Sequence, residues 1–303
     1  MAETVSKTTA WLAFIRPKTW GVAVAPVIAA LTLAAYETGT FDPLVAFFTL
    51  TIALLMQIIT NMENDIGYTE RKAETGNRRG LPRATTNGWI SMPTAKKAIR
   101  AMMLLALLNT ALLVWFGGWV FLLIGVSSII AAYAYMGGPR PIAYTPWGEL
   151  TVMVFFGLTA VIGTSALQAH DVSLFSVMLG FALGAVASAV LAINNWRDRE
   201  HDESINRITM AVFFGPKTFL VFFKAMILLP FVLFTAMALI NPAYIAVMLV
   251  FAALPKALKV TRDITRYQHY ELNQVLFSCV KLELIISVLF ALSMIFSIIA
   301  VRL

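Results

Sequence analysis

Long apolar runs recur along the whole chain, and they constrain its fold more than any other feature. A membrane-spanning helix needs about 20 mostly apolar residues. Nine runs approach that length, at residues 20–36, 43–62, 98–116, 119–136, 148–167, 172–193, 218–240, 243–258 and 280–301. The 303 residues are 59% hydrophobic and 13% charged, whereas charged residues make up about a quarter of ordinary soluble domains. We therefore predict an all-α, polytopic membrane bundle of about nine transmembrane helices, with residues 1–303 forming a single domain.

The positive charges divide the connections between these runs into two classes. The connections at 63–97, 137–147, 194–217 and 256–281 are basic, and those at 37–42, 117–118, 168–171 and 241–242 contain no Lys or Arg. Because positive residues accumulate in cytoplasmic loops, we predict a multi-pass protein of the cell (plasma or inner) membrane, with its N-terminus and active site on the cytoplasmic side. The net charge of +7 is then a topology signal. We expect membrane lipid as a partner, but no nucleic acid and no obligate protein partner.

Three polar residues are spaced four apart where the sixth apolar run ends: Asn194, Asp198 and Asp202. If the helix continues through them, they share one face and lie a turn apart. Carboxylates stacked in this way repel each other unless a cation lies between them, and Mg²⁺ prefers such oxygen ligands. The alternative is a solvated helix end whose charges pair with neighbouring arginines.

A second polar cluster, formed by Asn61, Asn64 and Asp65, ends the second apolar run at the same predicted level. Two such clusters facing each other across a bundle could hold two metal ions with a diphosphate between them. The basic residues nearby are Arg71, Lys72, Arg78, Arg79, Arg83 and Arg140. Arginine matches phosphate oxygens with two parallel hydrogen bonds, although loop arginines also serve membrane topology.

Several stretches resemble one family of membrane enzymes. They are Arg16-Pro17-Lys18-Thr19, Gly80-Leu81-Pro82-Arg83, the segment 137–144 (GGPRPIAY), Gly148-Glu149, Phe155-Phe156-Gly157, and the segment 193–198 with Asp202. Together they resemble the 1,4-dihydroxy-2-naphthoate polyprenyltransferases, the menaquinone branch of the UbiA superfamily. The resemblance implies helices around a central cavity that is open to the cytoplasmic side.

The resemblance also implies an activity, the Mg²⁺-dependent transfer of a polyprenyl group from polyprenyl diphosphate to 1,4-dihydroxy-2-naphthoate. CO₂ and diphosphate leave, and demethylmenaquinol forms. The implied metal ligands are Asn61, Asn64, Asp65, Asn194, Asp198 and Asp202, of which Asn64, Asp65, Asp198 and Asp202 are also expected to be catalytic. The expected substrate-binding residues are Lys18, Arg79, Arg83, Tyr135, Arg140, Tyr144 and Arg197. Either Arg140 or Lys18 would orient the acceptor carboxylate.

Two positions depart from the family pattern. Tyr68 stands where the first acidic motif usually ends in aspartate, and Phe213 replaces a later arginine. A phenol is a poor ligand for Mg²⁺ at neutral pH, so Asn61, Glu63 or Asp65 must compensate, or one metal site is weakened.

Two other functions fit the same composition. A related prenyltransferase would use a different acceptor, such as 4-hydroxybenzoate, homogentisate or haem. A membrane transporter would also be a polytopic bundle, but transporters place their polar sites near the middle of the bilayer, whereas both polar clusters here lie at one face. Release of diphosphate that requires Mg²⁺ would separate the enzymes from the transporter.

Overall fold

The computed structural model describes residues 5–73 and 80–302, with side chains through residue 300, and this part of the chain is helical without β-strands. The helices are α1 (Lys7–Ile15), α2 (Gly21–Thr38), α3 (Pro43–Glu70), α4 (Met92–Gly117), α5 (Val120–Met136), α6 (Gly148–Val152), α7 (Ala160–Ala169), α8 (Leu174–Ser204), α9 (Met210–Phe213), α10 (Gly215–Ile240), α11 (Leu254–Arg266) and α12 (Leu272–Arg302). The 3₁₀ segments are η1 (Pro17–Thr19), η2 (Ile142–Tyr144), η4 (Pro242–Ala253) and η5 (His269–Glu271), and η3 (Met153–Thr159) is a π-helix. Both η3 and η4 lie within membrane-length helical stretches, Gly148–Ala169 and Pro242–Arg266.

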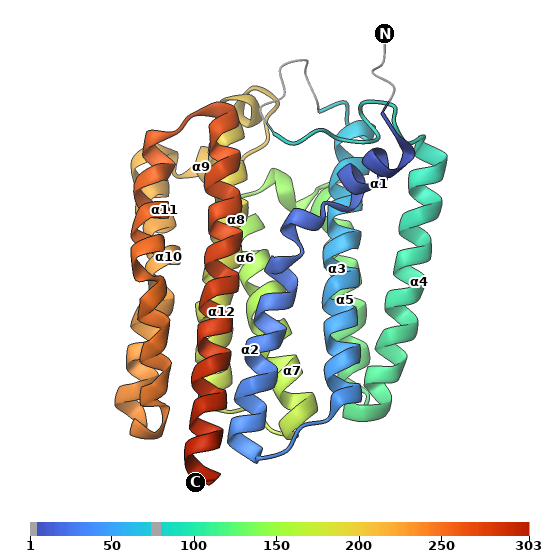
Figure 1. The fold of residues 1–303 in the computed structure, drawn as a ribbon. Helices are drawn as coiled ribbons and strands as arrows, with labels where there is room; N and C mark the ends of the chain where they lie inside the picture. Colours follow the sequence, from blue (N-terminus) through green and yellow to red (C-terminus); the bar gives the residue numbers. More distant parts are fainter. Residues whose placement is uncertain (1–4, 74–79, 303) are drawn as a thin grey trace.

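Eight helical stretches in the described part of the chain are long and apolar enough to cross a membrane, and α5 is a shorter apolar helix beside them. The predicted all-α, polytopic bundle is therefore confirmed, and each predicted run coincides with one of these nine stretches. The N-terminus and the C-terminus lie at opposite ends of the bundle, as an odd number of crossings requires (Figure 1).

At the end of the bundle that carries the C-terminus, short connections cap the helix ends. Asp42 begins α3 by accepting hydrogen bonds from the backbone N–H groups of Leu44 (2.8 Å) and Val45 (3.1 Å). The Gln168 side chain joins α7 to the same turn through two hydrogen bonds to the Asp42 backbone. Gly118 separates α4 from α5 at a φ of 81°, which only glycine adopts readily. These caps satisfy backbone groups that a helix end would otherwise leave without partners.

Two groups of helices pack on either side of the bundle centre. One buried apolar cluster joins α8, α10, η4, α11 and α12 with part of α2, and another joins α1, α3 and α4. In Figure 1 the first group lies to the left and the second to the right, with α2, α6 and α7 between them. The space between the two groups is where the cavities described below are found.

The backbone of the π-helix η3 approaches the backbone of α8 closely at Gly157. A Cβ atom on Gly157 would overlap the carbonyl oxygen of Gly180 and the Cα of Gly184. A π-helix has one extra residue per hydrogen-bonded turn, so it changes which side chains face a given direction. Here Phe155 and Phe156, which are adjacent in sequence, both line the central cavity.

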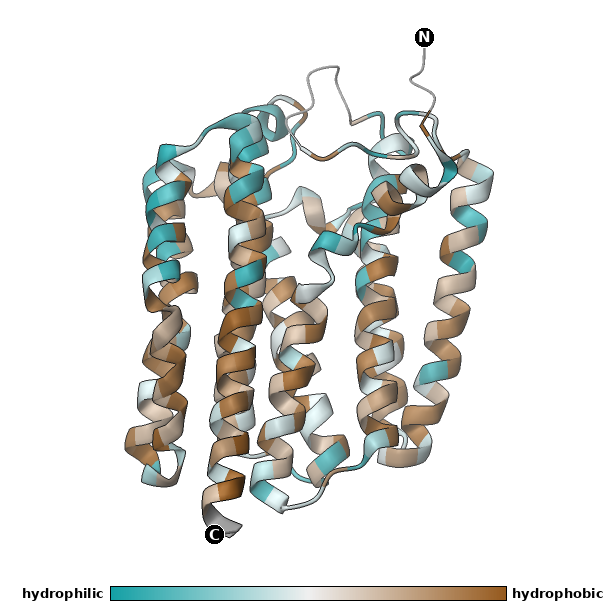
Figure 2. Cartoon of the chain, in the orientation of Figure 1, coloured by the Kyte–Doolittle hydropathy of each residue, from teal (hydrophilic) through white to brown (hydrophobic). Residues whose placement is uncertain are grey.

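Helices α3 and α8 continue beyond their apolar runs, so the two polar clusters predicted from the sequence lie in their last turns. Hydrophilic residues gather at the end of the bundle that carries the N-terminus, whereas the middle of the helices is mostly hydrophobic (Figure 2). We call this end the polar end.

Candidate active site

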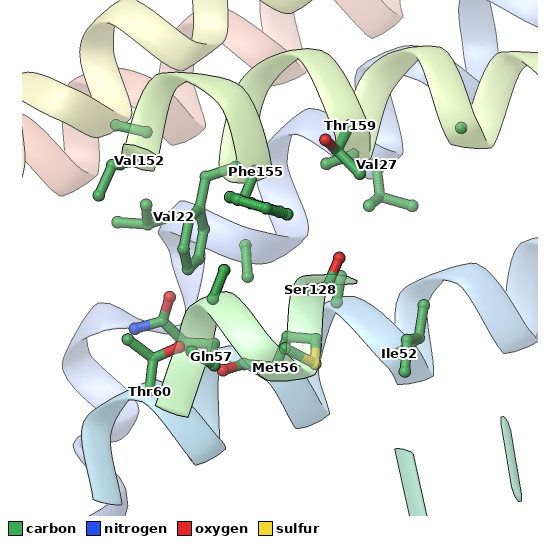
Figure 3. Close-up of a pocket in the computed structure, with 18 of the residues that line it drawn as sticks. Val22, Val27, Ile52, Met56, Gln57, Thr60, Ser128, Val152, Phe155 and Thr159 are labelled. Carbon is green, nitrogen blue, oxygen red and sulfur yellow. The ribbon is translucent and has the colours of Figure 1, made fainter. Parts of the chain in front are cut away.

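An apolar cavity of about 250 Å³ runs through the centre of the bundle. Figure 3 shows Val22 of α2, Met56 of α3 and Phe155 of η3 around it. Along α3 the wall extends from Thr49 to Asn64. At 1.5 Å per residue this is ~22 Å of helix. A cavity this long and apolar suits a hydrocarbon chain.

A polar pocket of about 60 Å³ adjoins this cavity at the polar end. The residues that line both spaces are Arg16, Thr19, Asn64, Tyr135, Leu191 and Asn194. The polar pocket is also lined by Tyr68, Leu81, Arg83, Asn195, Arg197, Asp198, Arg207, Asn273 and Leu276. Because the two spaces share walls, a ligand with a charged head and an apolar tail would fit across both.

The α8 side of the polar pocket carries Asn194 and Asp198, one turn apart. Arg197 donates two hydrogen bonds to the Asp198 carboxylate, of 2.9 Å and 2.6 Å, and a third of 2.6 Å to Asn273 Oδ1 of α12. Arg197 is 5% exposed. This buried fork fixes the orientation of the Asp198 carboxylate at the wall of the pocket.

The α3 side of the polar pocket carries Asn64 and Tyr68. Arg83, from the loop that follows α3, donates a hydrogen bond of 2.6 Å to Asn64 Oδ1 and lies over the Tyr68 ring. Arg83 is buried, at 4% exposed. The loop therefore delivers a cation to the pocket wall.

Asp65 lies behind this wall, fully buried, and lines neither space. One carboxylate oxygen accepts a hydrogen bond of 2.9 Å from Ala84 N–H, and the other accepts bonds from the Thr85 N–H (2.9 Å) and hydroxyl. Asp65 thus anchors the loop that carries Arg83.

Asn61 is also occupied by protein contacts. Its side-chain amide donates hydrogen bonds to the carbonyl of Ile15 (3.1 Å) and to the Thr19 hydroxyl (3.2 Å). These bonds hold the turn between α1 and α2, where Arg16 adopts a left-handed conformation (φ 49°). Asn61 lines the apolar cavity, and the turn that it holds places Arg16 at the junction of the two spaces.

Arg207 lines the polar pocket and connects its own segment to α3, α8 and η2. It donates hydrogen bonds to the Asp202 carboxylate (2.9 Å), the Ala143 carbonyl (2.8 Å) and the Tyr68 hydroxyl. Burial alone would lower the pKa of this guanidinium, but the neighbouring Tyr68 and Asp202 raise it, so Arg207 stays charged. Asp202 is fully buried and lines neither space, and its Oδ2 has no hydrogen-bond partner within residues 5–73 and 80–300.

The remaining predicted residues lie in different places. Tyr135 lines both spaces. Tyr144 is half-buried, with Arg71 over its ring, and burial raises the pKa of its hydroxyl, which stays protonated. Lys18 and Arg140 are both exposed, and neither lines either space. The Nζ of Lys18 lies 5.4 Å from the centre of the Phe277 ring. Arg79 lies outside the described residues.

Several residues of the polar pocket were not expected from the sequence as parts of the site, among them Arg16, Arg207 and Asn273. Arg16 is the first residue of the Arg-Pro-Lys-Thr stretch, in which Lys18, the third residue, was the expected site residue. The motif thus contained a cation of the pocket, but at its first position. Asn273 lies at the start of α12 with no motif around it, and only the packing of α12 against α8 brings it to the pocket.

The donor set of the polar pocket fits a divalent cation such as Mg²⁺. Asn64, Asn194 and Asp198 present amide and carboxylate oxygens to one small space. No group of three or more His, Cys, Asp or Glu side chains that could hold a metal ion together occurs in the described part of the chain. Mg²⁺ does not need such a cage, since it commonly binds one or two carboxylates and takes further oxygens from phosphate and water.

Comparison with known proteins places this architecture among relatives. The model of the UbiA prenyltransferase family matches residues 23–285. The 1,4-dihydroxy-2-naphthoate octaprenyltransferase of Escherichia coli (strain K12) is 38% identical over 221 residues, 70% of this chain and 71% of that protein. The protein of the same name from Haemophilus influenzae is 32% identical over 212 residues, 68% of this chain and 69% of that protein. A UbiA homolog from Archaeoglobus fulgidus, solved bound to GPP and Mg²⁺, has the same fold, with a TM-score of 0.69 and 19% identity, over 95% of this chain and 99% of that chain.

Proposed function

We propose that this chain, which belongs to the UbiA prenyltransferase family, transfers a polyprenyl group from polyprenyl diphosphate to 1,4-dihydroxy-2-naphthoate. CO₂ and diphosphate leave, and demethylmenaquinol forms. The observation that carries the proposal is the junction of an arginine-lined polar pocket with a long apolar cavity, because the donor is a diphosphate on a hydrocarbon tail. The relatives with the highest identities reported above carry the name of this reaction.

The donor would lie with its prenyl tail between α3 and η3 and its diphosphate in the polar pocket. This orientation places the allylic C–O bond near Tyr135 and Arg16, which line both spaces. When that bond breaks, its electron pair goes to the diphosphate, and the face of the Tyr135 ring can stabilise the positive charge left on the prenyl carbon. Arginines that are already in place stabilise the charge that develops on the diphosphate.

We place Mg²⁺ beside Asn194 and Asp198 on α8, two of the three predicted ligands that line the polar pocket. The third, Asn64 on α3, has its Oδ1 bonded to Arg83. The metal would neutralise charge on the departing diphosphate. The other predicted ligands, Asn61, Asp65 and Asp202, would act from behind the wall as positioning residues for Arg16, Arg83 and Arg207 respectively.

The acceptor would approach from the polar end, where its carboxylate meets a cation. Lys18 and Arg140 were expected in this role, but Arg16 is the cation that lies at the junction of the two spaces, and we propose it instead. The naphthoate ring supplies an electron pair to the prenyl carbon. The pair of the C–C bond to the carboxylate returns to the ring as CO₂ leaves, so the step takes up and releases no net proton.

The chain is a multi-pass membrane protein. We propose that the polar end faces the cytoplasm, because the basic loops are gathered there, and that the membrane is the cell membrane. Both substrates would then reach the site from the side where the loops lie.

The test uses purified protein in detergent with polyprenyl diphosphate, Mg²⁺ and one of three acceptors: 1,4-dihydroxy-2-naphthoate, 4-hydroxybenzoate or homogentisate. We expect a prenylated product and CO₂ with the naphthoate. A product with only 4-hydroxybenzoate or only homogentisate would overturn the assignment of the naphthoate as acceptor. No product with any of the three acceptors would overturn the enzymatic function.

A further inference from the structure

We propose that an arginine–tyrosine clamp, and not a metal ion, binds the part of the diphosphate that faces α3. The site then holds one divalent cation, whereas two complete acidic motifs would hold two. The clamp consists of Tyr68, Arg83 and Arg207. This inference deepens the proposed function and rests on it. It starts from Tyr68, which stands where the family pattern has an aspartate.

The α3 side of the polar pocket lacks a carboxylate among the residues that the structure describes there. Asp198 on α8 is the one acidic residue in that lining. Asp65, the remaining aspartate of the first motif, is fully buried and uses both carboxylate oxygens to hold Ala84 and Thr85. Rotating Asp65 into the pocket would leave those backbone N–H groups without partners, which is costly in a buried site.

Tyr68 is held as a hydrogen-bond donor. Arg207 donates to the Tyr68 hydroxyl oxygen, so the hydroxyl hydrogen remains to be donated elsewhere. Tyr68 lines the polar pocket, and a phosphate oxygen there is the acceptor that matches it. The ring is fixed from its face by Arg83, whose guanidinium carbon lies 3.4 Å from the ring centre. Tyr68 therefore serves an anion better than it serves a cation.

The two arginines of the clamp are preorganised. Arg83 is held by Asn64, and Arg207 is held by Asp202 and by the Ala143 carbonyl. Both are nearly buried, at 4% and 3% exposed, so neither must lose much conformational entropy when an anion binds.

The charge of the whole pocket agrees with this arrangement. Among the residues that the structure describes, its lining has four arginines, at positions 16, 83, 197 and 207, and a single carboxylate. The pocket is therefore cationic before any metal binds, and the fork of an arginine matches two phosphate oxygens. A second divalent cation on the α3 side would lie next to Arg83 and Arg207, whose charges repel it.

The test counts bound metal directly. Mn²⁺ replaces Mg²⁺ because its free ion is measured by electron paramagnetic resonance, and geranyl S-thiolodiphosphate serves as an unreactive donor analogue. Detergent-solubilised protein is titrated with Mn²⁺ at a saturating analogue concentration. We expect one Mn²⁺ per chain. Two Mn²⁺ ions with normal analogue binding would overturn the clamp alone, whereas no analogue binding at any Mn²⁺ concentration would overturn the proposed function as well.

Substitutions at Tyr68 test whether this position binds the diphosphate through its hydroxyl or helps to hold a metal ion. Tyr68→Phe keeps the ring and removes the hydroxyl, and it is expected to weaken analogue binding about tenfold, since a hydrogen bond to a charged group is lost. The Mn²⁺ count should stay at one. Tyr68→Asp is expected to raise the count to two. The matched control is Tyr133→Phe, at a tyrosine on α5 that is 50% exposed and lines neither space. Unchanged analogue affinity in Tyr68→Phe would overturn the clamp.

Discussion

Arg83 lies over the ring of Tyr68, with 3.4 Å between its guanidinium carbon and the ring centre. The two residues come from different segments, Tyr68 from the last turns of α3 and Arg83 from the loop that follows. The contact places a loop cation at the wall of the polar pocket. We therefore expect binding of the donor to depend on how firmly this loop is held to α3.

Arg83 is expected to set the affinity for the donor. Arg83→Ala should raise the KM for polyprenyl diphosphate at least about tenfold, because the substitution removes a charge-assisted contact between the guanidinium and the diphosphate. Arg83→Lys should restore only part of the affinity for the donor, since the lysine ammonium is not planar and cannot stack on Tyr68 while it bonds Asn64. Steady-state kinetics of both variants tests this. Arg262→Ala, at an exposed arginine of α11, is the control, and an equal KM in Arg83→Ala and Arg262→Ala would contradict the assignment.

Asp65 is expected to act on stability through the loop. Asp65→Asn keeps the size of the side chain but weakens three hydrogen bonds and turns an NH₂ group toward backbone donors. We expect a loss of about 1–3 kcal/mol in the free energy of unfolding, seen as a lower Tm in detergent. Asp171→Asn, at an exposed position between α7 and α8, should change Tm little. An unchanged Tm in Asp65→Asn would show that Asp65 does not anchor the loop.

The buried pair of Arg207 and Asp202 gives a test of coupling. Arg207→Met removes the positive partner from a fully buried carboxylate and should cost about 3–5 kcal/mol. Adding Asp202→Asn to that variant removes the uncompensated charge, so the double variant should be more stable than Arg207→Met. Chemical denaturation of the single and double variants measures this difference. Additive losses would mean that the two side chains do not interact.

Gly157 is expected to be intolerant of any side chain. Gly157→Ala places a Cβ atom against the backbones of Gly180 and Gly184, and overpacking of this kind costs about 1–3 kcal/mol. It should also separate η3 from α8 and so lower Tm. In Gly163→Ala, the control on the neighbouring α7, the new Cβ meets only the Phe121 ring at 3.9 Å. Equal Tm values for the two variants would contradict the close packing.

The sequence was sufficient to predict the nine long apolar helical stretches, though not the short helices α1 and α9, because the length of each apolar run follows from the thickness of a bilayer. It was also sufficient to place Asn64, Asn194 and Asp198 near one another, because both polar clusters end a helix at the same level of the bundle. It did not show which side of its helix each cluster residue faces. Asp65 follows the pocket residue Asn64, and Asp202 lies one turn after the pocket residue Asp198, but neither lines the pocket, since each is held by a partner elsewhere in the chain.

The cations of the site were harder to predict than its oxygen donors. Basic loops carry arginines for topology as well as for binding, and sequence spacing does not separate the two uses. Arg140 is exposed, whereas Arg16 reaches the pocket through a left-handed turn held by Asn61. Such a turn depends on a contact between α3 and the segment before α2, which periodicity does not reveal.

Product formation by Asp198→Ala is the most direct test of the polar pocket as the reaction site. The purified variant is given polyprenyl diphosphate, 1,4-dihydroxy-2-naphthoate and Mg²⁺, beside wild-type protein and Asp171→Ala. We expect wild type and Asp171→Ala to release CO₂ and form the prenylated product, and Asp198→Ala to be slower by at least about a hundredfold at a temperature at which all three proteins are folded. Wild-type turnover by Asp198→Ala would contradict the placement of the reaction in this pocket.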